Sequence, residues 1–189
     1  AGILFDGTLE DNALAFVDMS YATAGSQSIE VDRSKVTIDS MGWGGTTETI
    51  LEVDHPSLIV RNSVFPSIDG EEAIRGGSLG GGEYFVLEGN TFGTTLGDSD
   101  VVAFSDCQRP GPIFQAYSNT FHGGSDDILD LNGADAHIEG NLFENVHQAQ
   151  PGGGTSNAIA ATGGSDLTIV RNIFADVDHV LLLKGNSRA

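Results

Sequence analysis

The chain has 189 residues, enough for one domain with a substantial core, and its 8 basic and 27 acidic residues give a formal net charge of −19. This charge argues against nucleic acid as a partner, because phosphate binding needs clustered Lys and Arg. No apolar run approaches the roughly 20 residues of a membrane helix, and the single cysteine, Cys107, excludes an internal disulfide.

A short unit recurs along the chain. Asp18, Ser40 and Asn62 are spaced by 22 residues, and each is followed three residues later by an aromatic side chain, which predicts a column of Tyr21, Trp43 and Phe65. The pattern then becomes Asn-x-Phe at four places, beginning at Asn90, Asn119, Asn141 and Asn172. A minimum spacing near 22 residues with longer intervals indicates one repeating unit with insertions.

Each unit contains the same three segments. An alternating apolar stretch comes first, as at 49–53, 101–104, 128–131, 158–161 and 180–183. A second stretch follows a brief turn, as at 57–61, 84–88, 136–140 and 167–171, and a third begins at the Phe. Alternation bounded by Gly, Asn, Asp and Ser predicts strands and turns. We therefore expect an all-β coil of about seven rungs, with each strand paired to its equivalent about 4.8 Å along the axis.

The recurrent L-x-[IV]-x-x-N-x-F pattern, from about Leu14 to Leu183, resembles the right-handed parallel β-helix of the pectate-lyase-like superfamily. The segment "SDDILDLNGADAHIEGN" is also similar to β-helix domains of large secreted bacterial multidomain proteins. The resemblance implies an extracellular or cell-surface location and a substrate groove on the outer face of the first strand. We expect a single domain over 1–189, excised from a longer chain, whose ends pack on further domains or another subunit.

The repeated Asn and Phe residues have a structural explanation. Asn tolerates the left-handed backbone conformation of a sharp bend, and stacked amides can hydrogen-bond from rung to rung. Stacked Phe rings would fill the interior, at about 1.5–3 kcal/mol for each buried ring. The expected ladder consists of Asn62, Asn90, Asn119, Asn141 and Asn172.

The outer face of the first strand follows from the period-2 alternation. It predicts an outward column of Glu52, Arg75, Ala103, Asp130, Ala160 and Leu182. Leu181 and Leu183, like their equivalents on earlier rungs, are expected to face inward.

The turn before the first strand is acidic in most rungs. Carboxylates stacked on successive rungs repel unless they are splayed, protonated or bridged by a cation. The candidate site spans three rungs, under an expected overhang formed by residues 148–157, and comprises His122, Asp126, Asp127, Asp130, His147, Asp178 and His179. For a divalent cation such as Ca²⁺, the predicted ligands are Asp126, Asp127, His147, Asp178 and His179. The imidazoles would shift the preference toward a transition metal.

Catalytic signatures are incomplete. Asp126-Asp127 resembles the aspartate pair of polygalacturonase-type hydrolases, but Gly-His-Gly and Arg-Ile-Lys are missing. A lyase needs a cation and a base, for which Arg75 and Lys184 are the candidates. If the chain is an enzyme, it is a polysaccharide lyase or glycoside hydrolase with Asp126, Asp127, Asp130 and Arg75 as candidate catalytic residues.

Two functions remain open at this stage. The chain binds or cleaves an extracellular polysaccharide along the first-strand face with a divalent cation, or it is a non-catalytic structural or interaction module. The acidic residues themselves have three interpretations, as turn or surface residues, as cation ligands or as catalytic groups, because Asp before a strand is also a common turn residue.

Overall fold

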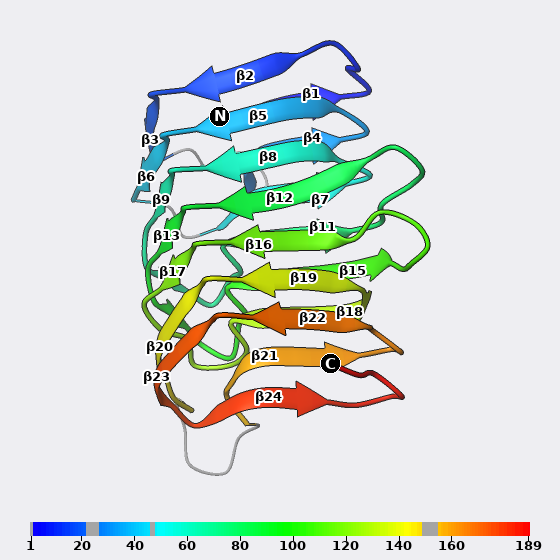
Figure 1. Ribbon diagram of the computed structural model, residues 1–189. Helices are drawn as coiled ribbons and strands as arrows, with labels where there is room; N and C mark the ends of the chain where they lie inside the picture. The colour runs from blue at the N-terminus through cyan, green and yellow to red at the C-terminus, as the bar shows by residue number, and fades with distance from the viewer. Residues whose placement is uncertain (1, 22–26, 46–47, 149–154) are drawn as a thin grey trace.

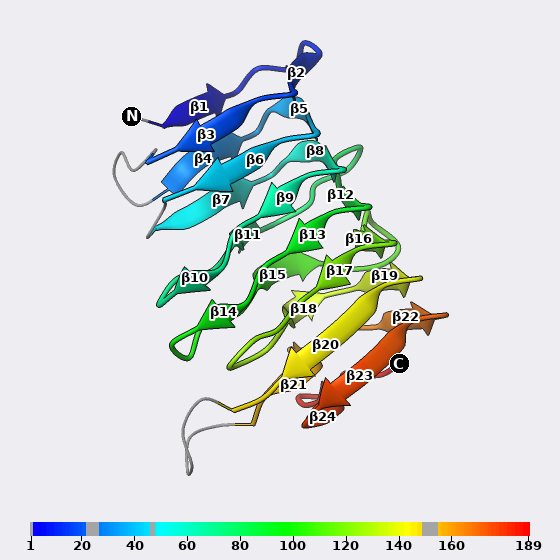
Figure 2. The same cartoon turned by 90° about the vertical axis from the view of Figure 1, so that its left-hand side faces the viewer.

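The computed structural model describes residues 2–21, 27–45, 48–148 and 155–189, and in these residues the protein is built from β-strands without a helix. Three all-parallel sheets wind around a common axis as a parallel β-helix (Figures 1 and 2). No helix in the described ranges is long and apolar enough to cross a membrane.

Each sheet collects one strand from every rung. Sheet A contains β1 (Ile3–Asp6), β4 (Gln27–Asp32), β7 (Thr49–Asp54), β11 (Ile74–Gly77), β15 (Val102–Cys107), β18 (Leu129–Ala134), β21 (Asn157–Thr162) and β24 (His179–Leu183). Sheet B contains β2 (Asn12–Ala15), β5 (Lys35–Asp39), β8 (Ser57–Arg61), β12 (Tyr84–Glu88), β16 (Phe114–Tyr117), β19 (Ala136–Glu139) and β22 (Leu167–Val170). Sheet C contains β3 (Asp18–Ser20), β6 (Gly42–Gly44), β9 (Val64–Phe65), β13 (Thr91–Phe92), β17 (Thr120–Phe121), β20 (Leu142–Val146) and β23 (Ile173–Val177). A two-stranded sheet pairs β10 (Ile68–Asp69) with β14 (Thr95–Leu96).

In the described residues, the coil has seven complete rungs and the first strand of an eighth, because sheet A has eight strands and sheets B and C have seven each. It begins earlier than the predicted Leu14, since Ile3 of β1 already pairs with Ile29 of β4. Strand β1 has only four residues, too few for its alternation of apolar and polar side chains to be recognised in the sequence.

The aromatic stack in sheet C is confirmed. Adjacent rings lie 4.4–5.1 Å apart between centroids, nearly parallel, in the order Trp43, Phe65, Phe92, Phe121, Phe143 and Phe174. Tyr21 was wrongly placed in this column, since it is 79% exposed. Met19 pairs with Trp43 instead and packs against the core. In the first unit of the repeat, the core position equivalent to Trp43 is therefore Met19, two residues before the predicted Tyr21.

The asparagine ladder is also confirmed from Asn90 onward. Its amides donate Nδ2–H to the Oδ1 of the next rung at 3.0 Å (Asn90 to Asn119), 3.0 Å (Asn119 to Asn141) and 2.9 Å (Asn141 to Asn172). Each Oδ1 also accepts the backbone N–H of the preceding rung's ladder residue, at 2.8–2.9 Å. Buried amides are thus satisfied by one another and by backbone carbonyls.

Asn62 does not belong to this ladder. The backbone N–H of Ser63, and not of Asn62, donates to Asn90 Oδ1 at 3.0 Å. Asn62 is exposed and has a φ of 52°. It shares the left-handed conformation with Gly89, which precedes the ladder residue of the next rung. The expectation that the ladder amides themselves adopt this conformation was wrong, because the residue before each of them makes the bend.

The predicted inward residues of sheet A pack as expected until the last rung. Leu129 and Leu131 of β18 are fully buried. Leu181 and Leu183 hold the same register, opposite Ile159 and Ala161. They are nevertheless 36% and 39% exposed, because no strand of the described chain pairs beyond β24.

Candidate functional site

The outer face of sheet A carries the predicted column of side chains. The strand register aligns them across six rungs in the order Glu52, Arg75, Ala103, Asp130, Ala160 and Leu182. Arg75 is held by two carboxylates, with Nη2 3.3 Å from Glu52 Oε2 and Nη1 3.9 Å from Glu71 Oε2. Its charge is therefore largely balanced on this face.

Two hollows open on this face and meet at Asp130. The larger has a volume of about 330 Å³ and extends between Arg75, Ala103 and Asp130. The smaller has a volume of about 60 Å³ and lies between Asp127, Asp130 and Lys184. Because Asp130 lines both, it stands between the open face of the sheet and the acidic corner.

The acidic corner is the turn between the third strand of one rung and the sheet A strand of the next. In three successive rungs, a polar residue stands two positions before the paired core residues Val102, Leu129 and Ile159. Since those core residues are paired, the register stacks Asp100, Asp127 and Asn157 in one column. Asn157 in turn lies opposite His179.

Three carboxylates come together in this corner. One oxygen each of Asp100, Asp126 and Asp127 lies within 4.8 Å of the others. Asp100 was absent from the candidate set, although its place two residues before the strand core is the same as that of Asp127. Comparison of the strand cores, instead of the Asn and Phe positions, would have identified it.

Burial and mutual repulsion raise the pKa values of these acids. Burial, with added repulsion from Asp130, Asp127 and Asp126, raises the pKa of Asp100 to about 8. Burial raises the pKa of Asp127 to about 6, against the stabilising hydrogen bond from Asn157. Near neutral pH, Asp100 therefore favours its protonated form and Asp127 its ionised form.

Asp126 and Asp130 are perturbed in the same direction. Burial is the main cause in both, followed by the charge of Asp98 for Asp126 and that of Asp126 for Asp130. The ammonium group of Lys184 opposes the rise in both pKa values. Lys184 thus provides a nearby positive charge for the Asp126 and Asp130 carboxylates.

Hydrogen bonds connect the stacked residues. The backbone N–H of Asp127 donates to Asp100 Oδ1 at 3.2 Å, and Asn157 Nδ2 donates to Asp127 Oδ1 at 2.6 Å. Asn157 is 1% exposed, and its Oδ1 has no hydrogen-bond partner in the described part of the chain. The converging carboxylate oxygens of Asp100, Asp126 and Asp127 are a donor set suited to a hard cation such as Ca²⁺.

The predicted histidines form separate pairs. His147 Nδ1 lies 2.9 Å from Asp178 Oδ1, and its Nε2 lies 3.3 Å from Asp176. His122 Nδ1 lies 2.6 Å from Glu144 Oε1. Among the described residues, only Asp100, Asp126 and Asp127 meet as a group of three potential ligands. The structure thus brings together Asp126, Asp127 and Asp130, and places His147 and Asp178 in a neighbouring surface pair.

His179 is exposed at the start of β24. Its charge lowers the pKa of Asp178, after the larger effects of His147 and of the backbone N–H of Gln148. The overhang predicted for 148–157 falls largely on residues 149–154, outside the described residues.

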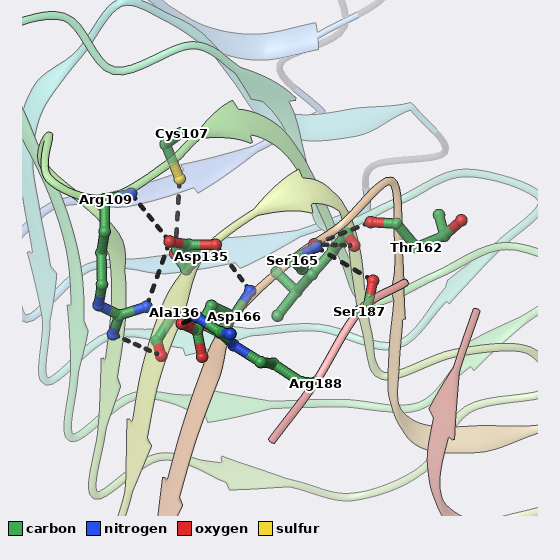
Figure 3. Close-up of polar contacts among 10 residues, drawn as sticks. Cys107, Arg109, Asp135, Ala136, Thr162, Ser165, Asp166, Ser187 and Arg188 are labelled. Carbon is green, nitrogen blue, oxygen red and sulfur yellow. Dashed lines mark hydrogen bonds and ion pairs between the residues drawn. The ribbon is translucent and has the colours of Figure 1, made fainter. Parts of the chain in front are cut away.

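Asp135 lies at the opposite end of the sheet A strands, away from the acidic corner. It is 3% exposed and accepts backbone N–H groups from Arg109 at 2.8 Å and Asp166 at 2.7 Å. Arg109 Nη1 is 3.3 Å from the same carboxylate (Figure 3). Asp135 therefore ties three rungs of the turn between sheets A and B together.

The fold and this site define an all-β parallel β-helix protein with an acidic corner beside one sheet face. No family model, curated protein or solved structure matches the chain. The class therefore rests on strand topology, register and side-chain geometry.

Proposed function

We propose that the chain is an extracellular or cell-surface β-helix domain that binds or cleaves a polysaccharide along the outer face of sheet A. The observation that carries this proposal is the position of Asp130, which lines both the 330 Å³ hollow and the small hollow beside Asp127. An extended ligand lying on the face would meet carboxylates with raised pKa values at that point.

A divalent cation, Ca²⁺ by its preference for oxygen ligands, belongs to the same proposal. Asp100, Asp126 and Asp127 would hold it, and its charge would offset the repulsion among them. His147, Asp178 and His179, first considered as ligands, would remain outside this ligand set because His147 is engaged by Asp176 and Asp178.

Cleavage would use the carboxylates of the small hollow in the protein without a bound cation, since a cation held by Asp127 would keep that carboxylate ionised. A raised pKa suits a general acid, and Asp127 and Asp130 are two such groups at one small hollow. Two carboxylates with different pKa values can act as acid and base in glycoside hydrolysis. Arg75, the candidate base for a lyase, is paired with Glu52 and Glu71, which favours hydrolysis over elimination.

The cation is tested by thermal unfolding of the apo protein with Ca²⁺, Mg²⁺ and Mn²⁺. A cation at 100 times its Kd stabilises the fold by about 2.7 kcal/mol, and Asp127→Asn should abolish most of that gain. Asp106→Asn, an exposed change at the far end of β15, is the control. A gain that is absent in the wild type, or equal in Asp127→Asn, contradicts cation binding in this corner.

Polysaccharide activity is tested with neutral and uronate polymers, by binding and by release of reducing ends or unsaturated products. Asp130→Asn should reduce cleavage at least 100-fold if Asp130 transfers a proton. If cleavage is absent in the wild type and binding remains, the domain is a binding module. If neither binding nor cleavage occurs with any polymer, the proposal is wrong.

A structural or interaction module is the second candidate. The repulsion among the acids of the corner can be relieved without a cation. The pKa of Asp100 is raised to about 8, which favours its neutral form, and Asn157 Nδ2 donates a hydrogen bond to Asp127. A corner that is stable without a cation and a chain that binds no polymer would favour this function.

A further inference from the structure

We infer that the groove on sheet A continues around the corner toward sheet B and that this longer groove binds a neutral, hydroxyl-rich polysaccharide. This inference rests on the proposed function and narrows its substrate class. Three observations support it: two hollows lie on the turn between sheets A and B, glycines line the middle one, and carboxylates outnumber guanidinium groups along the three hollows.

The hollows form a continuous series. The 330 Å³ hollow on sheet A includes Asn132, which also lines a second hollow of about 470 Å³. Gln108 lines that second hollow and also a third, of about 310 Å³, next to Arg109 and Arg188. Because each neighbouring pair shares a side chain, the three hollows adjoin one another, from Arg75 on β11 to Arg188 at the end of the chain.

Glycines keep the middle of the groove open. Gly133 and Gly163 stand on successive rungs with φ angles of 66° and 70°. A Cβ on Gly163 would lie 2.8 Å from the backbone nitrogen of Gly133 and 2.9 Å from Asn132 Oδ1. A side chain at Gly163 is therefore excluded by both conformation and space, and the two glycines contribute backbone to the lining of the second hollow.

The third hollow has a polar wall of paired side chains. Arg109 Nη1 donates to the carbonyl oxygen of Asp166 at 2.5 Å, and Arg188 Nη2 lies 2.6 Å from Asp166 Oδ2. Figure 3 shows both guanidinium groups beside the Asp135–Asp166 pair. The wall thus presents guanidinium donors and carboxylate acceptors side by side, paired with one another and with backbone carbonyls.

The charge of the groove selects against a polyanion. Six carboxylates line the three hollows, against three guanidinium groups. The guanidinium groups of Arg75, Arg109 and Arg188 are each within 4 Å of a carboxylate of the chain. A uronate polymer would meet excess negative charge here, whereas sugar hydroxyls, which both donate and accept, match the carboxylate, amide and guanidinium groups.

The test is affinity electrophoresis in gels containing neutral polymers (hydroxyethyl cellulose, galactomannan, arabinoxylan, dextran) or polygalacturonate, without divalent cations. The variant is Gln108→Ala with Asn132→Ala, two exposed residues that connect the hollows. Gln115→Ala on the outer face of sheet B is the matched control. Far-ultraviolet circular dichroism and melting curves establish that all variants fold.

We expect at least one neutral polymer to retard the wild type and Gln115→Ala, and the double variant to bind about tenfold more weakly. Retardation by polygalacturonate alone, or neutral binding unchanged in the double variant but lost in Asp130→Asn, overturns this inference and leaves the proposed function standing. Absence of binding to every polymer in this assay overturns this inference, and absence of both binding and cleavage when the assays are repeated with Ca²⁺ overturns the proposed function as well.

Discussion

Replacement of Asp100 by Asn should stabilise the protein at neutral and alkaline pH. Asn keeps an oxygen that can accept the Asp127 backbone N–H, now at 3.2 Å, and carries no charge. Burial and the charges of Asp130, Asp127 and Asp126 raise the pKa of Asp100 from 3.8 to about 8, so the folded state prefers the protonated acid. The stability that this proton provides is complete below about pH 4 and is lost as pH rises toward 8.

The size of the effect follows from the pKa. A shift from 3.8 to about 8, at about 1.4 kcal/mol for each pKa unit, gives an upper value near 6 kcal/mol at pH 8. Water reaches part of the Asp100 carboxylate, and Asp126 and Asp127 share the repulsion, so the expected gain is about 2 kcal/mol. For a chain of this size, that gain corresponds to an increase in Tm of about 4–8 °C.

Urea unfolding at pH 4, 6 and 8 in the presence of a chelator measures this gain. The difference between Asp100→Asn and the wild type should be near zero at pH 4 and largest at pH 8. Asp106→Asn, an exposed carboxylate at the end of the same strand, controls for loss of a negative charge. A gain of equal size at all three pH values, or a loss of stability at pH 8, would refute the reasoning.

Three further predictions concern the core and the surface pair. Phe92→Ala removes a fully buried ring from the stack and should cost about 3–5 kcal/mol of unfolding free energy; a cost below 1 kcal/mol in urea titration would mean that the stack is not a packed core. Asn119→Ala leaves the backbone N–H and the Nδ2–H of Asn90 without their shared acceptor and should cost about 2–4 kcal/mol. Asn62→Gly, which lies outside the ladder and keeps the left-handed φ of 52°, should cost less than about 1 kcal/mol by the same measurement. The hydrogen bonds that the His147 imidazole donates to the carboxylates of Asp178 and Asp176 hold the pKa of His147 above its usual 6.5, so Asp178→Asn should lower that pKa in an NMR titration of the imidazole protons; an unchanged pKa would show that the pair does not form in solution.

The local pattern predicted the strands and the two ladders. Phe92, Phe121 and Phe143 recur at one point of a strand-and-turn pattern, and this recurrence is enough to stack them once the strands pair in parallel. The prediction failed at Asn62 and Tyr21, where the sequence was aligned by residue type. The register is set by the buried residues of the strands, so Ser63 and Met19 occupy those positions instead.

The candidate site could be predicted only in part. The outward position of Asp130 follows from alternation with Leu129 and Leu131. Asp100 stands at the same distance from the strand core as Asp127, so its place in the column could be predicted, whereas the meeting of its carboxylate with those of Asp126 and Asp127 and the separation of His147 depend on turns whose lengths differ between rungs. Turn geometry is not periodic, so no alternation rule reaches these side chains.

The sequence by itself determined that the chain is all-β, that its strands alternate inside and outside, and that its negative charge gathers at one turn of the repeat, because these properties depend on residue order within a single rung. Only the tertiary structure decided which carboxylates meet, which of them hold protons, and that Asn132 and Gln108 connect three hollows into one groove. Those properties arise between rungs, where residues 22 to 34 positions apart along the chain are brought into contact by the register of parallel strands.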